Sequence, residues 1–99
     1  MTAYLIAHVK VTDPAAFESY RMAAPAIIEK YGGRYLVRGG AVDVLEGDWT
    51  TPSLVILAFA SPRQARRFYD SPEYQEILPL RRATAEGTVI IVEGSGGAD

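Results

Sequence analysis

The feature that most constrains the fold is a repeated junction, Val11-Thr12-Asp13-Pro14 and again Phe59-Ala60-Ser61-Pro62. In both copies an apolar stretch with strand character ends just before a residue whose side chain can cap a helix, and proline follows. Asp13 and Ser61 can accept hydrogen bonds from first-turn amides, and proline suits the first helical position because its missing N–H would be unpaired there. The repetition predicts two strand-to-helix units in one domain.

The hydrophobic pattern around these junctions predicts the other elements. Every second residue of 3–11 is aliphatic, as in a strand with one buried face, and 53–60 is almost entirely apolar, as in a central strand covered on both faces. Internal prolines predict a kink or break near Ala23 and an interruption at Pro79. The predicted order is a strand at 3–11, a helix at 14–31, strands at 34–38, 42–46 and 53–60, helical segments from 61 and 71, and a strand at 88–93.

The stretch from Tyr31 to Gly40 leads from the first helix into the second strand. Either Gly32 or Gly33 can adopt the left-handed conformation that ends a helix. A glycine pair at 39–40 interrupts the strand, as a bulge or turn would. Because Arg34 and Arg38 are four residues apart in an extended segment, we expect them to project from the same face.

This order of elements is typical of an α+β domain with a ferredoxin-like split βαβ fold, in which both helices lie on one face of an antiparallel sheet. The opposite face would expose the apolar side chains of strand 53–60 as a large patch unless a second sheet covers it. We therefore expect the chain to bind itself as a homodimer. We expect one domain over 1–94 and a flexible tail at 95–99, where a glycine-rich sequence has nothing to bury.

Composition excludes several kinds of site. The 99 residues include no cysteine and one histidine, so we expect no disulfide, no thiol nucleophile and no transition-metal site within one chain. No phosphate loop or dinucleotide fingerprint occurs, and we expect no cofactor. A net charge of −2 gives no electrostatic reason to expect nucleic acid or an acidic membrane as a partner. Because the sequence shows no signal core and no apolar run of membrane-spanning length, we expect a cytoplasmic protein.

Several motifs resemble those of the domain of unknown function 1330 family. They are Tyr-Gly-Gly-Arg-Tyr-Leu-Val-Arg-Gly-Gly at 31–40, Leu45-Glu46-Gly47-Asp48-Trp49, Ala65–Tyr69 followed by Ser71-Pro72-Glu73-Tyr74, and Val92-Glu93-Gly94. The resemblance covers nearly the whole chain and implies a dimeric α+β barrel, in which two ferredoxin-like sheets join and each half holds a small cavity. Related barrels include cofactor-free monooxygenases, small-ring isomerases and haem-using enzymes. The family supplies no reaction and no catalytic residue for this chain.

The candidate catalytic residue is His8, because histidine is the residue type that most readily gains and loses a proton near neutral pH. It lies on the mixed face of strand 3–11, and it points into the barrel if the aliphatic face of that strand meets the helices. The alternative interpretation is an interior histidine held by hydrogen bonds. The candidate ligand-binding residues are Tyr4, Tyr20, Arg34, Arg38, Glu46 and Trp49.

Each group of ligand-binding candidates also has a purely structural interpretation. Arg34 and Arg38 can hold a carboxylate-bearing ligand, or they can form an internal salt bridge with Glu46 on a neighbouring strand. Aromatic residues at helical spacing can line a pocket for a planar ligand or simply fill the core. Arginines at 63, 66, 67, 81 and 82 predict a solvated basic face, in which Arg81 is placed to cap a helix end.

Two hypotheses about function follow. The first is a small-molecule-binding protein or a cofactor-independent enzyme of the dimeric barrel type, acting on a small aromatic or carboxylated metabolite by general acid or base chemistry. The second is a non-catalytic structural homodimer with a filled core. A cavity with His8 and an arginine in its wall would favour the first hypothesis, and whether the chain is an enzyme is left open.

Overall fold

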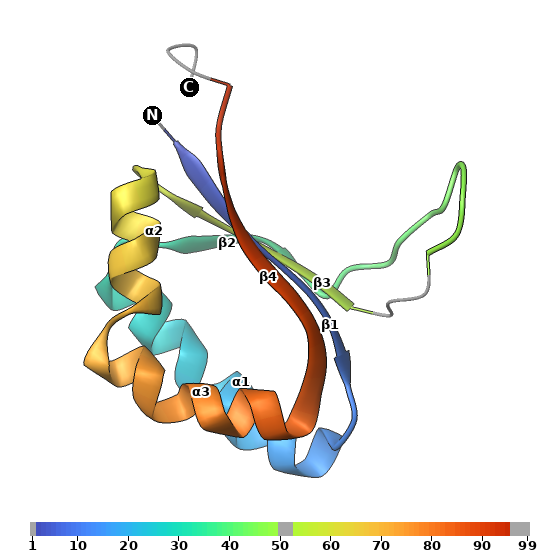
Figure 1. Cartoon of the computed structure of the whole chain (residues 1–99), viewed down its shortest axis with the longest axis horizontal. Coiled ribbons are helices and arrows are strands. Elements are labelled where there is room, and N and C mark those ends of the chain that lie inside the picture. The colour runs from blue at the N-terminus through green and yellow to red at the C-terminus, as the bar shows by residue number, and fades with distance from the viewer. Residues whose placement is uncertain (1, 50–52, 96–99) are drawn as a thin grey trace.

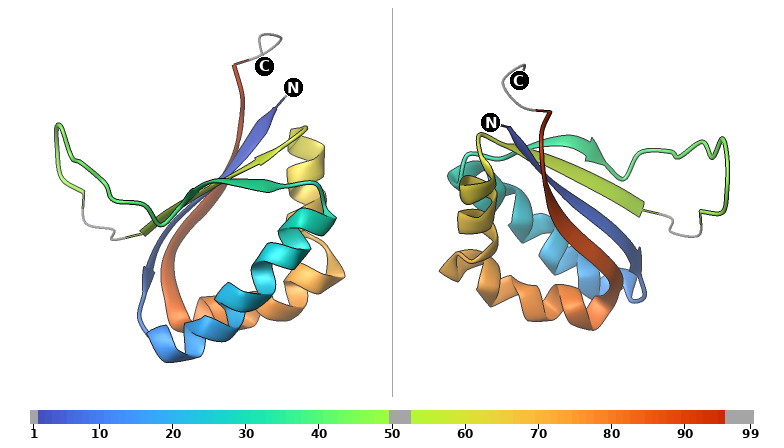
Figure 2. Two further views of the ribbon diagram at one scale, coloured as in Figure 1. Left: turned by 180° about the vertical axis from the view of Figure 1, so that it is seen from behind. Right: turned by 45° about the horizontal axis from the view of Figure 1, so that its top comes forward.

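One antiparallel sheet with helices on a single face makes up the fold. The computed structural model describes residues 2–49 and 53–95. The elements are β1 (Ala3–Val11), α1 (Pro14–Lys30), β2 (Arg34–Arg38), β3 (Ser53–Phe59), α2 (Pro62–Tyr69), α3 (Pro72–Thr84) and β4 (Ala85–Glu93). The strands lie in the order β2-β3-β1-β4, and Figures 1 and 2 show the helices gathered on one side of them. The predicted α+β ferredoxin-like fold is confirmed, with β1 and β3 at the centre of the sheet.

Two further predictions concern the ends of the chain and membranes. The predicted tail begins at Ser95, and its residues 96–99 lie outside the described part of the chain. Among residues 2–49 and 53–95, no helix combines the length and the apolar character that crossing a bilayer requires.

The helices begin where their capping residues predict. The side chains of Asp13, Ser61 and Ser71 each accept a hydrogen bond from the backbone N–H three residues later, at 3.1–3.2 Å. Neither helix is broken, because α1 continues through Pro25 and α3 continues through Pro79, so the expected interruption at Pro79 is wrong. The kink expected near Ala23 stays a prediction. Packing of the helices against each other and against the sheet stabilises them more than one missing backbone hydrogen bond weakens them.

The predicted strand at 42–46 is also wrong. Residues 40–49 contain no strand and are all exposed, and they form a loop that extends away from the domain (Figure 1, green). Gly39 has a φ of +70° and turns the chain away from the sheet. Alternation of apolar residues cannot produce a strand without a neighbouring strand to pair with, since a strand is stabilised through its cross-strand bonds and contacts.

A register shift in β2 separates the two arginines that the sequence places on one face. Arg34 lies opposite Ala58 and Arg38 lies opposite Val55, with the shift between them after Tyr35. Directly paired residues share a face of the sheet, and the side chains of a strand alternate between its faces. Arg38 is therefore on the helix side and Arg34 on the open side, which corrects the prediction. The extra residue of a bulge reverses the alternation.

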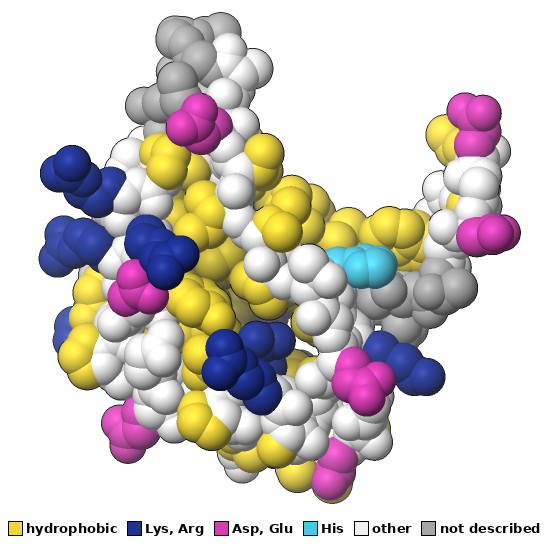
Figure 3. Space-filling model, in the orientation of Figure 1, with side chains coloured by type: hydrophobic (Ala, Val, Ile, Leu, Met, Phe, Trp, Pro, Cys, Tyr) yellow, Lys and Arg dark blue, Asp and Glu magenta, His cyan; other side chains and the backbone are white. Residues whose placement is uncertain are grey.

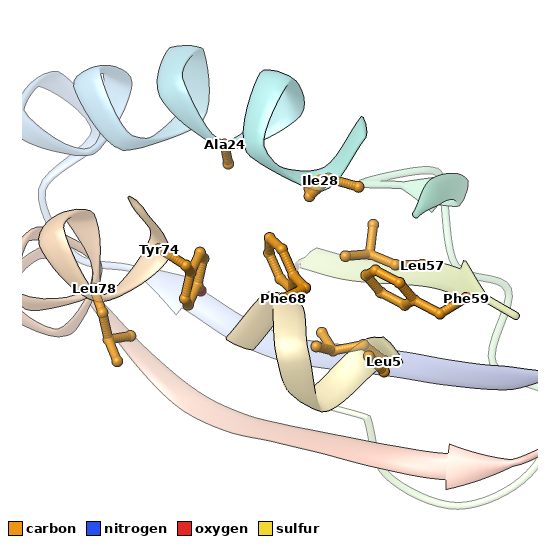
Figure 4. Packing of buried hydrophobic residues seen from close by; sticks show 9 residues of the cluster. Leu5, Ala24, Ile28, Leu57, Phe59, Phe68, Tyr74 and Leu78 are labelled. Carbon is orange, nitrogen blue, oxygen red and sulfur yellow. The ribbon is translucent and has the colours of Figure 1, made fainter. Parts of the chain in front are cut away.

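The core lies between the helices and the sheet, around Phe68. This side chain is 1% exposed, and its ring centroid lies 5.5 Å from that of Phe59 and 4.7 Å from that of Tyr74. Figure 4 shows Phe68 reaching from α2 toward Ile28 of α1 and Leu57 of β3. One aromatic ring thus contacts parts of the chain that are distant in sequence, and it joins α2 to both layers.

Substitution of Gly33 is expected to destabilise the protein. A Cβ at this position would lie 2.6 Å from the Phe59 ring and 2.9 Å from Cγ2 of Ile28, so Gly33→Ala should lower the free energy of unfolding by about 1–3 kcal/mol. Urea denaturation measures the loss. The matched control is Gly40→Ala, because a Cβ there meets no described atom within 4 Å. Equal losses for the two variants would contradict the packing argument.

The sequence had left open which glycine ends α1. Gly32 has a φ of +82°, and its N–H donates to the carbonyl of Glu29 at 3.0 Å. The Gln64 amide donates to the carbonyl of Tyr31 at 2.8 Å, which anchors the same helix end to α2. Gly32 is therefore required by its backbone conformation and Gly33 by the close approach of its neighbours.

A pH-dependent contact joins α1 to α3. Glu73 accepts hydrogen bonds from the Lys30 ammonium and, at 2.8 Å, from the Tyr31 hydroxyl, which together lower the pKa of Glu73 from 4.5 to about 2. Because the folded-state pKa is the lower one, the contact stabilises the fold above pH 4.5 and is lost as the pH falls toward 2. Glu73→Gln should therefore weaken the acid dependence of the melting temperature between these pH values. The exposed neighbour Glu76→Gln is the control, and identical profiles for both variants would refute the contact.

Candidate functional site

A cavity of about 600 Å³ lies between the helix-facing side of the sheet and helices α1 and α3. Figure 3 shows a hollow bordered by hydrophobic side chains, with Lys and Arg side chains at one side of it. The walls are mainly apolar, and residues such as Leu5, Ala7 and Val9 of β1 form its floor. The polar side chains in its lining are Tyr20, Tyr35, Tyr74, Arg21, Arg38, Arg81 and Ser53.

The polar groups of this cavity are dominated by hydrogen-bond donors. No Asp, Glu, His, Lys or Cys belongs to the described lining. A guanidinium group has five N–H donors and no acceptor, and it keeps its charge at every physiological pH. The cavity can therefore neutralise negative charge on a bound molecule. It has no carboxylate or imidazole in the described lining to remove a proton from that molecule.

Arg81 is the most unusual of these residues. It is only 9% exposed, and its Nε–H has no hydrogen-bond acceptor in the described part of the chain. No described carboxylate forms an ion pair with it. Removing a guanidinium from water without a partner costs several kcal/mol. The folded protein thus places a buried guanidinium with an unsatisfied Nε–H on the wall of its cavity.

The predicted solvated position of Arg81 is wrong, because this side chain is buried, although Arg81 lies in the last turn of α3 as expected. Arg82 is exposed, as expected, but Arg81 lies on the buried side of α3 with Tyr74 and Leu78. These positions are separated by four and three residues, which places them on one face of a helix. That spacing was the available signal for a buried arginine.

The other two arginines of the cavity lie where it reaches solvent, because both are exposed. Arg21 is neutralised by Glu18, with a shortest distance of 2.7 Å. The Arg38 guanidinium carbon lies 4.6 Å from the centre of the Tyr35 ring, and no described carboxylate pairs with it. Arg38 and Arg81 therefore provide the uncompensated positive charge.

Two tyrosines supply a second set of donors. The hydroxyl oxygens of Tyr20 and Tyr74 are 2.6 Å apart, so one hydroxyl donates to the other. The accepting hydroxyl keeps its own O–H, which can donate to a ligand. Burial, reinforced by Tyr74, raises the pKa of Tyr20 far above its ordinary value of 10.0. Burial likewise raises the pKa of Tyr35. Tyr20 therefore remains protonated at neutral pH, where it can donate a hydrogen bond and cannot act as a base.

The structure brings only some of the predicted site residues to this cavity. Tyr20 and Arg38 line the cavity, whereas Tyr4, His8, Arg34, Glu46 and Trp49 do not. The ring centroid of His8 lies 4.4 Å from that of Trp49, which belongs to the loop 40–49. His8 is on the open face of β1, whereas the bulge turns Arg38 to the helix side, so these two residues do not share one cavity. A catalytic role for His8 on the open face stays a prediction.

The strand order and the helices on one face of the sheet define a ferredoxin-like α+β domain. The model of the domain of unknown function 1330 family matches residues 2–95, so the chain belongs to this family. The resemblance noted in the sequence is thereby confirmed over nearly the whole chain. No protein with a curated function matches the sequence.

Solved structures show the same fold in proteins of low sequence identity. A protein of unknown function from Rhodopseudomonas palustris, RPA0582, has a TM-score of 0.77 and 17% identity, with 94% of this chain and 82% of that chain covered. SnoaB, a cofactor-independent oxygenase from Streptomyces nogalater, has a TM-score of 0.67 and 17% identity, with coverages of 94% and 92%. Rv0793 from Mycobacterium tuberculosis has a TM-score of 0.62 and 17% identity, with both chains covered completely.

Proposed function

We propose that the chain binds a small organic molecule in the cavity between the sheet and helices α1 and α3. The observation that carries this proposal is the cavity itself, about 600 Å³ of space between the sheet and the helices of a 99-residue domain. Ligand pockets generally measure about 300–1,000 Å³ and combine apolar walls with a few converging polar groups. The alternative of a homodimer with a filled core is less consistent with so large a space.

We further propose that any reaction in this cavity is cofactor-independent and proceeds through an oxyanion. Prealigned donors stabilise negative charge that develops on a substrate oxygen, and Arg81 and the Tyr20–Tyr74 pair are such donors. Because the described lining has no carboxylate or imidazole, the substrate must lose its proton readily by itself. The fold similarity to the cofactor-independent oxygenase SnoaB supports this proposal at the level of architecture.

The binding proposal is tested by blocking the cavity. Ala7 lines it from β1, so Ala7→Phe should remove the increase in melting temperature that carboxylic acids, phenols or amides produce in the unaltered protein. Ala26→Phe is the matched control, because Ala26 is exposed on α1 and does not belong to the described cavity lining. The proposal fails if no compound raises the melting temperature, or if the increase persists in Ala7→Phe.

We also propose that the chain forms a homodimer through the open face of the sheet. Ile90 and Val92 on this face of β4 are 48% and 41% exposed, and Leu45 and Trp49 of the neighbouring loop are 87% and 41% exposed. Large apolar side chains exposed in this way generally mark an interface. A second copy supplies the same face, and a closed pair can cover both.

Sedimentation is expected to show a dimer at micromolar concentration. Ile90→Lys should shift the equilibrium to monomers, because the interface would have to bury an unpaired ammonium group. Met22→Lys is the control, since Met22 is 74% exposed on α1, on the far side of the sheet. A monomeric unaltered protein would disprove the interface.

A further inference from the structure

The cavity presents unmatched hydrogen-bond donors at its buried end. The guanidinium of Arg81 is buried, and its Nε–H has no acceptor among residues 2–49 and 53–95. The hydroxyls of Tyr20 and Tyr74 share one hydrogen bond at 2.6 Å, which leaves one O–H available. No carboxylate belongs to the described lining. A neutral ligand could accept a hydrogen bond there, but only an anion would also compensate the charge of Arg81.

The arrangement of charges also orients the ligand. Arg21 is already paired with Glu18, and Arg38 is exposed to water, which screens its charge. Both therefore attract an anion less than the buried Arg81 does. The remaining wall is largely aliphatic and aromatic, with Phe17, Val55 and Phe68 among its residues. Such a wall favours an apolar body and disfavours a small hydrated ion such as inorganic phosphate.

We propose that the ligand of this cavity is an organic acid bound as its anion, which is a carboxylate or a phenolate on an apolar body. This assignment rests on the proposed function of the cavity. The charged oxygen lies against Arg81 and the Tyr20–Tyr74 hydroxyl pair, and the apolar body lies along the sheet. Carboxylate and phenolate share the chemistry that these groups recognise, namely a negatively charged oxygen acceptor.

The carboxylate arm of the test compares 2-naphthoate with 2-naphthamide, which has nearly the same shape and no charge. Isothermal titration calorimetry of the unaltered protein should show the amide binding about tenfold more weakly or worse, as loss of a charge-assisted hydrogen bond predicts. Arg81→Met should weaken the binding of 2-naphthoate by a similar factor and leave the affinity for 2-naphthamide nearly unchanged. Arg82→Met is the matched control, because Arg82 is the exposed neighbour on the same helix, and it should leave both affinities unchanged.

The phenolate arm uses 4-nitrophenol, whose anion absorbs at a longer wavelength than the neutral form. Binding next to an unpaired guanidinium should lower the apparent pKa of the bound probe by about one unit or more. The spectral titration should show this decrease in the unaltered protein and in Arg82→Met, and it should disappear in Arg81→Met. If the protein prefers 2-naphthoate to its amide but does not lower the pKa of 4-nitrophenol, the site selects carboxylates. The reverse result would show that it selects phenolates.

The outcomes separate this inference from the proposed function. If neither the acid nor the amide binds, the cavity is not a ligand site and both proposals fail. If the amide binds as tightly as the acid, or if Arg81→Met keeps the preference for the acid, the ligand-binding function survives and the anion assignment is refuted. The comparison of acid and amide needs no variant, so it shows whether the site prefers an anion even if Arg81→Met does not fold.

Discussion

Replacement of Phe68 by alanine is expected to lower the free energy of unfolding by about 3–5 kcal/mol, as truncation of a buried phenylalanine does in other cores. Phe68 is 1% exposed, and its ring packs between those of Phe59 and Tyr74. Removing the ring would enlarge the adjacent cavity and separate α2 from both layers of the domain. Urea denaturation at one fixed protein concentration measures the change, since dimer formation makes stability depend on concentration.

A matched truncation tests whether the effect belongs to the core position. Phe17 is half-buried near the start of α1 and also lines the cavity. Phe17→Ala should therefore lower the free energy of unfolding clearly less than Phe68→Ala does. A loss below about 1 kcal/mol for Phe68→Ala, smaller than a typical core truncation, would show that its ring is not central to the packing.

Arg81→Met should change stability in the opposite direction and raise the free energy of unfolding by about 1–4 kcal/mol, the range seen when well-packed apolar residues replace buried charges. Methionine keeps the length and the apolar stem of the side chain and removes the charge that has no partner among the described residues. A residue that weakens the unliganded fold is expected where function requires it, because stability is often lower at binding sites.

The control for this prediction is the neighbouring arginine. Arg82→Met changes an exposed residue of the same helix, so its effect should remain within about 0.5 kcal/mol of zero. Denaturation of both variants without ligand gives the comparison. A loss of stability in Arg81→Met would mean that its guanidinium is already compensated, and the anion site would lose its main support.

Local sequence signals predicted most of the fold because they act over a few residues. Asp13 and Ser61 cap their helices as expected, and the predicted strand at 3–11 coincides with β1. The apolar run at 53–60 forms β3 at the centre of the sheet. Capping and strand alternation depend on near neighbours in the chain, so one sequence is sufficient to recognise them.

Signals that depend on a partner strand could not be evaluated in the same way. The alternating residues 42–46 have strand character but no strand to pair with, and they remain in an exposed loop. The bulge in β2 is visible only against β3, and it moves Arg38 to the cavity and leaves Arg34 on the other face. Spacing along a strand predicts a shared face only while the register is unbroken.

Apart from the strand expected at 42–46, the sequence by itself determined the order of strands and helices, the helix starts and the apolar faces, because these follow from interactions between near neighbours. Only the tertiary structure decided which polar residues meet at the cavity, since α1, β2 and α3 contribute Tyr20, Arg38 and Arg81 from distant parts of the chain. It also decided that Arg81 is buried without a described carboxylate partner. Whether a charge is compensated depends on the groups that packing brings around it, and no local pattern records those groups.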